Sequence, residues 1–489
     1  MATFAEKFSY MDTIFSMSKE GKSEYCCNVI RIGQILPIPG KDLIGQTLVN
    51  GESIVIRKDQ VKEGDVLLYA GNETQLAPAF LKANCLYSEP SMNADKDRKG
   101  YFGKNGRVRM IRLGGVQSMG YLFTKAELAA WCPAAGDAVL EEHIGEDFDT
   151  VCGNLLVRAY VPPVRKKERM ADDKGRRKTV KKFDRFLSES RFEFHYETKP
   201  LAKNLERLEP DSRIDVTVKV HGTSVIISRI PVRVPLKVGM KGKILNAFIK
   251  WTGLLKKYTV PEFKTEYGVV YSSRNVIKNR YINPDSDPGG YYGQDIWSEF
   301  GELLADYVYP GMTVYGEIAG YLSGVQQGIQ KDYDYGCEMG KNVLMPYRIT
   351  TEDLTEAGLK VRREWEVEEV MQWVRMVRLA APASVRERLM PMTVLYSGPV
   401  RNMYEGIDFE ADIWRDEFLA RMKGDTKRLG MERSEPLCLH HRVPREGVCI
   451  RIRQDSYAEC FKLKALAFLD KEAREIDAGN VDMEMAEGV

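Results

Sequence analysis

Short apolar runs alternate with turn residues over the first quarter of the chain. Three segments within residues 25–130 carry this pattern: CCNVIRIGQILPI, ESIVIRKDQVKEGDVLLYAG and GRVRMIRLGGVQSMGYLF. They are rich in β-branched residues and are punctuated by Gly, Pro and Asn, which predicts a small β-barrel, closed or partly open. Such barrels bind oligonucleotides or act as docking modules, and the pattern leaves both uses open.

The middle of the chain mixes strands and helices. The runs IDVTVKV and SVIISRI alternate with a period of two, as half-buried strands do. Residues 242–257 instead place Ile244, Phe248, Trp251 and Leu255 at helical spacing, with the lysines largely off that face. We expect this helix to pack its apolar face into the core, and a basic helix that faces a polyanion is the lesser alternative.

The remaining segments complete an α+β fold. FTKAELAAW is typical of a short helix, the block 351–440 is charged and helix-prone, and the acidic end of the chain is expected to fray. The expected units are a β-barrel domain at 1–135, a linker with a basic segment at 136–189, an α+β domain at 190–470 with a helical insertion at 351–440, and an acidic tail at 471–489.

Composition narrows the class of protein. A chain of 489 residues suits two or three domains, and 72 Lys and Arg against 70 Asp and Glu leave a net charge of +2, which argues against a general nucleic-acid coat. No run approaches the ~18 apolar residues of a membrane span, and the start of the chain has no secretory apolar segment. Nine cysteines without CxxC pairs and five histidines without zinc spacing predict reduced thiols. We therefore expect a cytoplasmic protein (in the host cytoplasm if it is viral) with no membrane partner.

One segment is strongly basic although the whole chain is balanced. Residues 164–185 hold eleven Lys and Arg against four Asp and Glu. A solvated linker between domains is the favoured interpretation. The alternative is a strap that contacts phosphates and becomes ordered on nucleic acid.

The most informative segment is Thr217-Val-Lys-Val-His-Gly-Thr-Ser224. A lysine ends an alternating strand there, and the glycine that follows allows a tight turn and a close backbone approach. Burial beside valines, together with nearby cations, favours the neutral form of an amine, which is the nucleophilic form. Alone the segment is a weak indication, because a surface lysine before a hairpin turn gives the same pattern.

Five further segments follow in order: Ser272-Ser-Arg-Asn275, Val314-Tyr-Gly-Glu-Ile-Ala-Gly320, Val343-Leu-Met-Pro-Tyr-Arg-Ile349, Arg445-Glu-Gly-Val-Cys-Ile-Arg451 and Glu459-Cys-Phe-Lys-Leu-Lys464. The ordered set resembles the motifs of the covalent nucleotidyltransferases, the superfamily of ATP-dependent ligases and mRNA capping enzymes. His221 stands where DNA ligases favour Asp, which is similar to RNA ligases. The stretch Phe194-His-Tyr-Glu-Thr198 resembles the RNA ligase branch typified by the Deinococcus enzyme, in which a small OB-like barrel precedes an ATP-grasp-like adenylyltransferase domain of antiparallel sheets and helices.

The resemblance implies roles for individual residues. The nucleophile of the family falls on Lys219, which would attack the α-phosphate of ATP to form lysyl-AMP. Glu317 would hold the adenosine ribose, and Arg274 would contact the ribose or a 5′-phosphate, to which a planar cation with several donors is suited. Tyr347 stands where the family stacks an aromatic ring on adenine, and an ordinary core tyrosine is the alternative.

The last two motifs imply the metal and phosphate ligands. Glu446 would bind Mg²⁺ or Mn²⁺, for which carboxylate oxygen is a suitable ligand. Lys462 and Lys464 alternate along a strand, so both would point to the α-phosphate from one face. His221, beside Gly222 in the nucleotide-binding turn, is either a hydrogen-bond donor to phosphate or a residue that stabilises the turn.

Two features depart from the family pattern. The interval between Tyr347 and Glu446 is long, so the role of the block 351–440 is not inherited. Only 25 residues follow Lys464, whereas DNA ligases and capping enzymes place an OB domain after this motif. This difference counts against both of those readings, and it leaves the residues that orient pyrophosphate unassigned.

We therefore expect a monomeric, ATP-dependent RNA ligase that joins 3′-hydroxyl and 5′-phosphate ends of RNA, or of an RNA-containing nicked duplex, in nick or break repair. Another covalent nucleotidyltransferase, either a DNA ligase or an mRNA guanylyltransferase, is the first alternative. The second is a non-catalytic nucleic-acid-binding protein on a ligase scaffold. Intact Lys219, Glu446, Lys462 and Lys464 weigh against that last reading.

Overall fold

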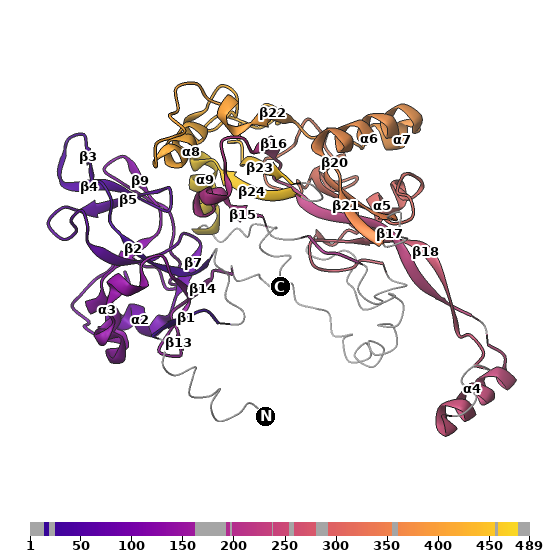
Figure 1. The fold of residues 1–489 in the computed structure, drawn as a ribbon, viewed down its shortest axis with the longest axis horizontal. Helices are drawn as coiled ribbons and strands as arrows, with labels where there is room; N and C mark the ends of the chain where they lie inside the picture. The colour runs from indigo at the N-terminus through magenta and orange to yellow at the C-terminus, as the bar shows by residue number, and fades with distance from the viewer. Residues whose placement is uncertain are drawn as a thin grey trace.

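The computed structural model describes residues 14–18, 25–161, 192–195, 198–236, 238–253, 259–279, 292–354, 360–454 and 458–477. The basic segment at 164–185 and the end of the expected tail, 478–489, lie outside the described residues. The described chain forms a mixed α+β fold of mostly antiparallel sheets, with the N-terminal strands at one end and a long hairpin at the other (Figure 1). Among these residues, no helix has the length and apolar composition needed to cross a bilayer.

The N-terminal strands pair into several small antiparallel sheets. The largest has the order β10 (Tyr121–Phe123), β6 (Val66–Ala70), β2 (Cys27–Arg31), β11 (Asp147–Phe148). A second has the order β3 (Leu36–Ile38), β4 (Lys41–Val49), β5 (Glu52–Arg57). The remaining pairings are β1 (Phe15–Ser16) with β12 (Thr150–Val151) and β13 (Asn154–Leu155), β14 (Val157–Ala159) with β7 (Thr74–Leu76), and β8 (Ile111–Leu113) with β9 (Val116–Ser118).

The four-stranded sheet is buried on both faces, which explains its continuous apolar runs. On one face Ile30 and Tyr69 pack against the β3–β4–β5 sheet. On the other face Val29 and Leu68 pack against two helices, α2 (Pro78–Ala83) and α3 (Lys125–Trp131). The helix predicted from FTKAELAAW is therefore present.

The expected barrel is not found among the described strands. Their hydrogen bonds leave five separate N-terminal sheets rather than one closed sheet. The expected linker at 136–189 also begins too early, because β11 pairs with β2 and β14 pairs with β7. These strands are only two or three residues long, too short to show a clear period of two in the sequence.

Two larger sheets follow in the chain. The first has the order β15 (Lys199–Pro200), β24 (Ala458–Lys464), β23 (Gly447–Arg453), β16 (Arg213–Lys219), β22 (Val394–Pro399). The second has the order β18 (Phe263–Ser272), β17 (Thr223–Pro235), β19 (Met312–Gly320), β20 (Asn342–Leu354), β21 (Lys360–Glu364). Helices α8 (Trp414–Gly424) and α9 (Leu466–Asp477) share the apolar core of the first sheet, and α5 (Ile296–Leu303) and α6 (Val367–Ala380) share that of the second.

The chain crosses from the first sheet to the second at one short turn. Strand β16 ends at Lys219, and β17 begins at Thr223. Within the turn, a Cβ on Gly222 would lie 2.3 Å from the carbonyl oxygen of Ile318 in β19. Since no side chain fits at that distance, glycine is required for the two sheets to meet here.

The block 351–440 is not only helical. It contains α6, the short α7 (Ala383–Arg386) and α8, but β21 lies at the edge of the second sheet and β22 at the edge of the first. The strongly charged composition of β21, KVRRE, conceals its pairing with β20. The expected acidic tail likewise begins inside helix α9, where Ile476 is buried.

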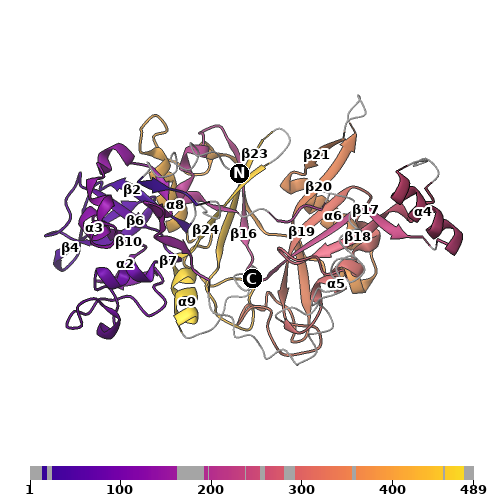
Figure 2. The same ribbon diagram turned by 90° about the horizontal axis from the view of Figure 1, so that it is seen from below.

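The N-terminal sheets contact the first large sheet through α8 and α9 (Figure 2). Lys423 of α8 forms an ion pair with Glu52 of β5 at 3.1 Å. Met110 and Met119 pack against Leu469 of α9 in a small apolar cluster. We call the described residues up to 161 the N-terminal unit. This unit is therefore held next to α8 and the C-terminal helix α9 by both charged and apolar contacts.

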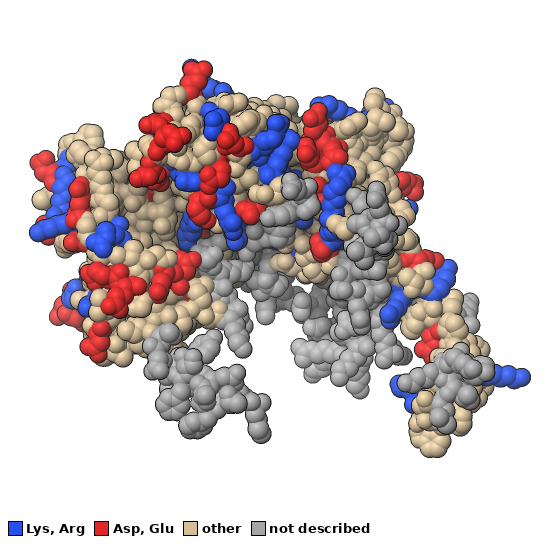
Figure 3. Space-filling model, viewed as in Figure 1, with Lys and Arg blue, Asp and Glu red and all other residues tan. Residues whose placement is uncertain are grey.

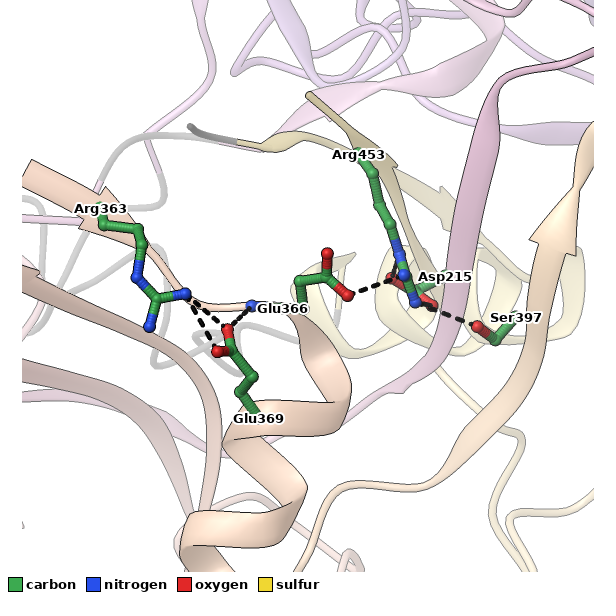
Figure 4. A network of polar contacts seen from close by, with 6 residues as sticks. All are labelled: Asp215, Arg363, Glu366, Glu369, Ser397 and Arg453. Carbon is green, nitrogen blue, oxygen red and sulfur yellow. Dashed lines mark hydrogen bonds and ion pairs between the residues drawn. The ribbon is translucent and has the colours of Figure 1, made fainter. Parts of the chain in front are cut away.

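Arg453, the last residue of β23, links several elements (Figure 4). Its Nε and Nη2 donate to the two oxygens of Asp215 in β16, each at 2.8 Å, and this hydrogen bonding raises the pKa of Arg453. Nη2 also donates to Ser397 Oγ of β22 at 3.2 Å, and Nη1 donates to Glu366 at 2.8 Å. Because Glu366 immediately precedes α6, one guanidinium joins the first sheet to the helix that packs on the second.

Replacing this arginine tests the network. Arg453→Ala is expected to lower the free energy of unfolding by about 3 kcal/mol, because Asp215, only 1% exposed, would keep a buried charge without its bidentate partner. The matched control is Arg363→Ala, which removes the more exposed pair with Glu369 shown in Figure 4 and should cost less than about 1 kcal/mol. Urea unfolding followed by circular dichroism measures the free energy of unfolding of both variants. An equal loss of free energy in the two variants would contradict the role given to Arg453.

Candidate active site

The two large sheets line a pocket beside the β16–β17 turn. Four of the residues singled out in the sequence, Lys219, Arg274, Glu317 and Tyr347, line it together. The rest of the lining comprises His195, Thr198, Thr217, Val218, Val220, Ser224, Met345, Arg348, Met392, Cys449, Arg451 and Cys460.

Lys219 lies against a buried carboxylate. Its Nζ is 2.7 Å from Oε1 of Glu446, a residue that is 1% exposed. The register of β16 against β23 produces this contact, because Lys219 pairs with Gly447, the neighbour of Glu446. An adjacent carboxylate favours the ammonium form of a lysine. Lys219 is thus an ion-pair partner of Glu446 in this structure, and the neutral nucleophile expected from the sequence stays a prediction.

Gly447 is required for a similar steric reason. A Cβ at this position would lie 2.1 Å from the carbonyl oxygen of Leu463 in β24. The missing side chain lets β23 and β24 approach each other directly beside Glu446. A Gly next to the carboxylate is thus part of the geometry of the site.

His221 lies behind the ion pair in an aromatic enclosure. Its backbone N–H donates to Tyr335 Oη at 2.7 Å. The imidazole ring meets Tyr333 and Phe468 edge-on, with centroid distances of 4.8 and 5.0 Å. Its Nδ1 is 3.7 Å from Glu446 Oε2. These contacts are those of a residue that stabilises the turn and faces the carboxylate.

Glu317 and Tyr347 come from neighbouring strands of the second sheet. Glu317 pairs with Ser224 on one side and with Met345 on the other, which directs it into the pocket. Tyr347 is half-buried, and its ring meets His195 edge-on at 5.5 Å. Burial, and to a lesser extent the charge of Glu317, raises the pKa of Tyr347, so its hydroxyl stays neutral.

Buried charges connect the two sheets at the pocket. Arg348 Nε lies 3.0 Å from Glu364 Oε2, and Arg451 Nη1 lies 3.5 Å from Glu364 Oε1. Arg451 Nη2 also donates to the carbonyl oxygen of Tyr347 at 2.8 Å. Since Arg451 belongs to the first sheet and Tyr347 to the second, this bond fixes the pocket wall.

Lys462 and Lys464 continue the pocket face of β24 beyond Cys460. Neither lysine is part of the pocket lining. Lys464 Nζ instead donates to Glu472 Oε1 of α9 at 2.8 Å. The same surroundings include Glu73, whose pKa is raised first by burial and then by the charge of Glu472. The N-terminal unit therefore adjoins the partner of Lys464.

Two cysteines lie in the pocket on adjacent strands. A hydrogen bond from Cys449 lowers the pKa of Cys460 to about 7, burial opposes this change, and the charge of Arg451 supports it. The same hydrogen bond, with burial, raises the pKa of Cys449. The two sulfurs share a hydrogen-bonded proton, so loss of a proton involves the pair.

The sequence interpretation missed Arg348, Cys449, Arg451 and Cys460 as site residues. All four stand inside segments that were recognised. Alternation along a strand was an available indication for three of them, since residues 447, 449 and 451 share a face of β23 and residues 460, 462 and 464 share a face of β24. It gives no indication of Arg348, because Arg348 directly follows Tyr347 in β20 and alternation would place it on the opposite face. His195 and Thr198 stand in the stretch Phe194-His-Tyr-Glu-Thr198 that carries part of the family resemblance, and the fold brings both to the pocket.

The carboxylate of Glu446 fits the chemistry of a divalent cation at this site. Among the described residues, no group of three or more His, Cys, Asp or Glu side chains could hold a metal ion. Mg²⁺, however, is commonly held by one or two carboxylates together with waters and substrate phosphates. The buried carboxylate of Glu446, at the pocket end of Lys219, is suited to that mode.

Comparison with solved structures identifies the fold. The chain is similar to the Naegleria gruberi RNA ligase in three structures of mutants: two with ATP and Mn (15% identity, TM-scores 0.50 and 0.51, 91% of this chain and 98% of that chain covered) and one with AMP and Mn (14% identity, TM-score 0.51, 92% and 99% covered). No protein-family model and no curated protein sequence matches the chain. At this level of identity the similarity shows that the fold is that of an RNA ligase and shows nothing more.

The cysteine pair provides a test of the pocket. Alkylation of Cys460 by iodoacetamide, measured by mass spectrometry, should speed up as the pH rises through about 7, because the thiolate is the reactive form. Cys460→Ser is the control for assigning the labelled peptide. A midpoint near the ordinary thiol value of about 8.5 would contradict the lowered pKa of Cys460.

Proposed function

We propose that this protein is an ATP-dependent RNA ligase that joins 3′-hydroxyl and 5′-phosphate ends through lysyl-AMP and adenylated RNA. One observation carries the proposal: Lys219, Arg274, Glu317 and Tyr347, which come from four separate motifs, line one pocket, and Glu446 from a fifth contacts Lys219. The shared fold supports it, because the Naegleria gruberi RNA ligase has been solved with ATP, with AMP and with PPi.

In the first step Lys219 is the nucleophile. After its ammonium releases a proton to solvent and leaves Glu446, Nζ forms a bond to the α-phosphorus of ATP, and the α–β phosphoanhydride bond breaks to release pyrophosphate. An oxygen of the RNA 5′-phosphate then attacks the phosphorus of lysyl-AMP, and the Nζ–phosphorus bond breaks, so that AMP passes to the RNA and Lys219 takes up a proton again. A 3′-hydroxyl attacks the RNA 5′-phosphorus and loses its proton to solvent, and the phosphodiester forms as the bond to AMP breaks.

The other pocket residues bind and orient the nucleotide. Glu317 accepts hydrogen bonds from the ribose hydroxyls, and Arg274 donates to the ribose or to the 5′-phosphate. The ring of Tyr347 offers a face on which adenine stacks, and the hydrogen bond from Arg451 to its carbonyl oxygen fixes its strand. His221 holds the turn that carries Lys219, and Gly222 lets the turn lie against β19.

Charge neutralisation at the phosphates comes from two directions. Glu446 holds Mg²⁺ or Mn²⁺, which supplies positive charge to the phosphate oxygens when it is bound. Lys462 and Lys464 supply cations from β24. Because Lys464 is bound to Glu472 in this state, it must exchange that carboxylate for phosphate in order to act.

The substrate is RNA or an RNA-containing nicked duplex, bound by a monomer. The N-terminal unit adjoins α9 and the Lys464–Glu472 pair, so nucleic acid held by that unit would reach the site from this side. Sealing of nicked duplexes that carry RNA or DNA on either side of the nick distinguishes the two enzymes. An RNA ligase should require RNA at the nick, whereas a DNA ligase should seal a nick between two DNA strands.

Lys219→Ala tests the nucleophile. The variant should form no lysyl-AMP and should not seal 5′-phosphate ends, yet it should retain some sealing of pre-adenylated RNA, because that substrate bypasses the first step. Denaturing electrophoresis with α-labelled ATP measures the adduct. Lys264→Ala, which alters an exposed lysine of β18, is the matched control and should behave as the wild type. A persistent labelled adduct in Lys219→Ala would exclude Lys219 as the nucleophile.

The choice of nucleotide separates the ligase from a guanylyltransferase. With a divalent cation present, labelled ATP should mark the protein on a denaturing gel and labelled GTP should not. Adding pyrophosphate should remove the label, because the first step is reversible. Labelling by GTP alone would overturn the ligase proposal.

A further inference from the structure

Helix α4 (Met240–Thr252) extends away from the rest of the molecule. It connects β17 and β18, which pair as antiparallel strands. The pairing begins where Ile226 lies opposite Ser272 and ends where Pro235 lies opposite Phe263, and it forms the projecting hairpin seen in Figures 1 and 2. The core packing expected for Ile244, Phe248 and Trp251 is therefore wrong, and Leu255 lies outside the described residues. The helix predicted from the apolar spacing is present, but nothing in the described chain covers its apolar face.

Four large apolar side chains form one outward stripe on α4. Met240, Ile244, Phe248 and Trp251 follow one another at intervals of four, four and three residues, which places them on a single face. Their exposed fractions are 79%, 64%, 51% and 85%. We call these four residues the α4 stripe.

The opposite face of the helix holds it in place. Ile249 is buried, and Asn246 forms hydrogen bonds with both the backbone N–H and the carbonyl oxygen of Val260 and with the carboxylate of Glu262. A Cβ on Gly242 would lie 2.7 Å from Val238, which shows how closely the helix meets the chain that leads into it. The α4 stripe is thus presented outward by a helix that is fixed from behind.

Lysines lie on both sides of the stripe. At 100° per residue, Lys241 falls beside one edge of it, and Lys243 and Lys250 fall beside the other. All three are exposed, and the helix contains no acidic residue. In Figure 3 this end of the molecule shows tan side chains with blue ones beside them.

We propose that α4 binds an anionic lipid surface, with the α4 stripe inserted at the headgroup boundary and the lysines against the headgroups. An apolar stripe with Trp and Phe between rows of Lys is the pattern of helices that lie in a membrane interface. The hairpin holds the helix beyond the body of the protein, so the stripe can reach a flat surface. This peripheral contact differs from the absence of a membrane partner expected from the sequence, and it does not depend on the proposed ligase activity.

Other occupants match the stripe less well. RNA would stack on Phe248 and Trp251, but it offers nothing to Met240 and Ile244, and the lysines would be expected at the centre of a phosphate-binding face. A second copy of the chain, docked stripe to stripe, would bring two sets of three lysines together without an acid on either helix. A membrane surface with negative headgroups satisfies both the apolar and the charged residues.

Vesicle binding by the full-length protein tests the proposal. The protein should co-sediment with phosphatidylcholine vesicles that contain phosphatidylglycerol, and much less with pure phosphatidylcholine vesicles. The double variant F248S/W251S should lose about tenfold or more in affinity, because two aromatic side chains no longer leave water. The double variant K243E/K250E should also bind more weakly, and its residual binding should depend less on salt.

Control variants distinguish binding by the α4 stripe from nonspecific hydrophobic adsorption and from misfolding. L379S on α6 removes an apolar side chain that is 81% exposed, and it should leave vesicle binding unchanged. The α4 variants should keep the wild-type unfolding curve and lysyl-AMP formation, since they alter neither the cores nor the pocket. Equal binding by wild type and F248S/W251S, or no binding to anionic vesicles, would overturn the proposal. A loss of RNA affinity or of dimer in the α4 variants, with vesicle binding unchanged, would also overturn it.

Discussion

The buried contact between Lys219 and Glu446 is the interaction on which the candidate site depends. It joins the end of β16 to the start of β23 at 2.7 Å, and it requires glycine at 222 and at 447, where a Cβ would meet the neighbouring strand. A carboxylate with almost no exposure is costly unless a cation compensates it. Lys219 does so in this state. The same carboxylate suits a divalent cation, so the proposed nucleophile and the proposed metal ligand would share one buried charge.

Polar contacts join the two sheets at the pocket, next to an apolar core to which both sheets contribute. Ala319 of the second sheet belongs to the same core as Val216 of the first. Arg451 reaches from β23 to the backbone of Tyr347, and Arg453 reaches from β23 to the residue that precedes α6. These polar contacts add to the shared core in fixing one sheet relative to the other.

Two peripheral elements extend this arrangement. The N-terminal unit contacts α9, and α9 holds Lys464 through Glu472, so a change at this contact would alter the cation nearest to Glu446 along β24. At the opposite end, the β17–β18 hairpin carries α4 away from the body. The central pocket thus lies between the C-terminal helix that binds Lys464 and an exposed amphipathic helix fixed from behind.

The sequence alone indicated the candidate site residues and determined their order along the chain, because short motifs and strand alternation are local properties. It indicated Lys219, Glu317, Tyr347 and Glu446, the helix of FTKAELAAW and the apolar spacing of α4. Only the tertiary structure decided what these features contact. Strand register placed Glu446 against Lys219, the crossing of the chain brought His195 to Tyr347, and β21 joined a sheet despite its charged sequence. Periodicity shows that a helix has an apolar face, but whether that face is buried depends on distant segments, and for α4 no described segment covers it.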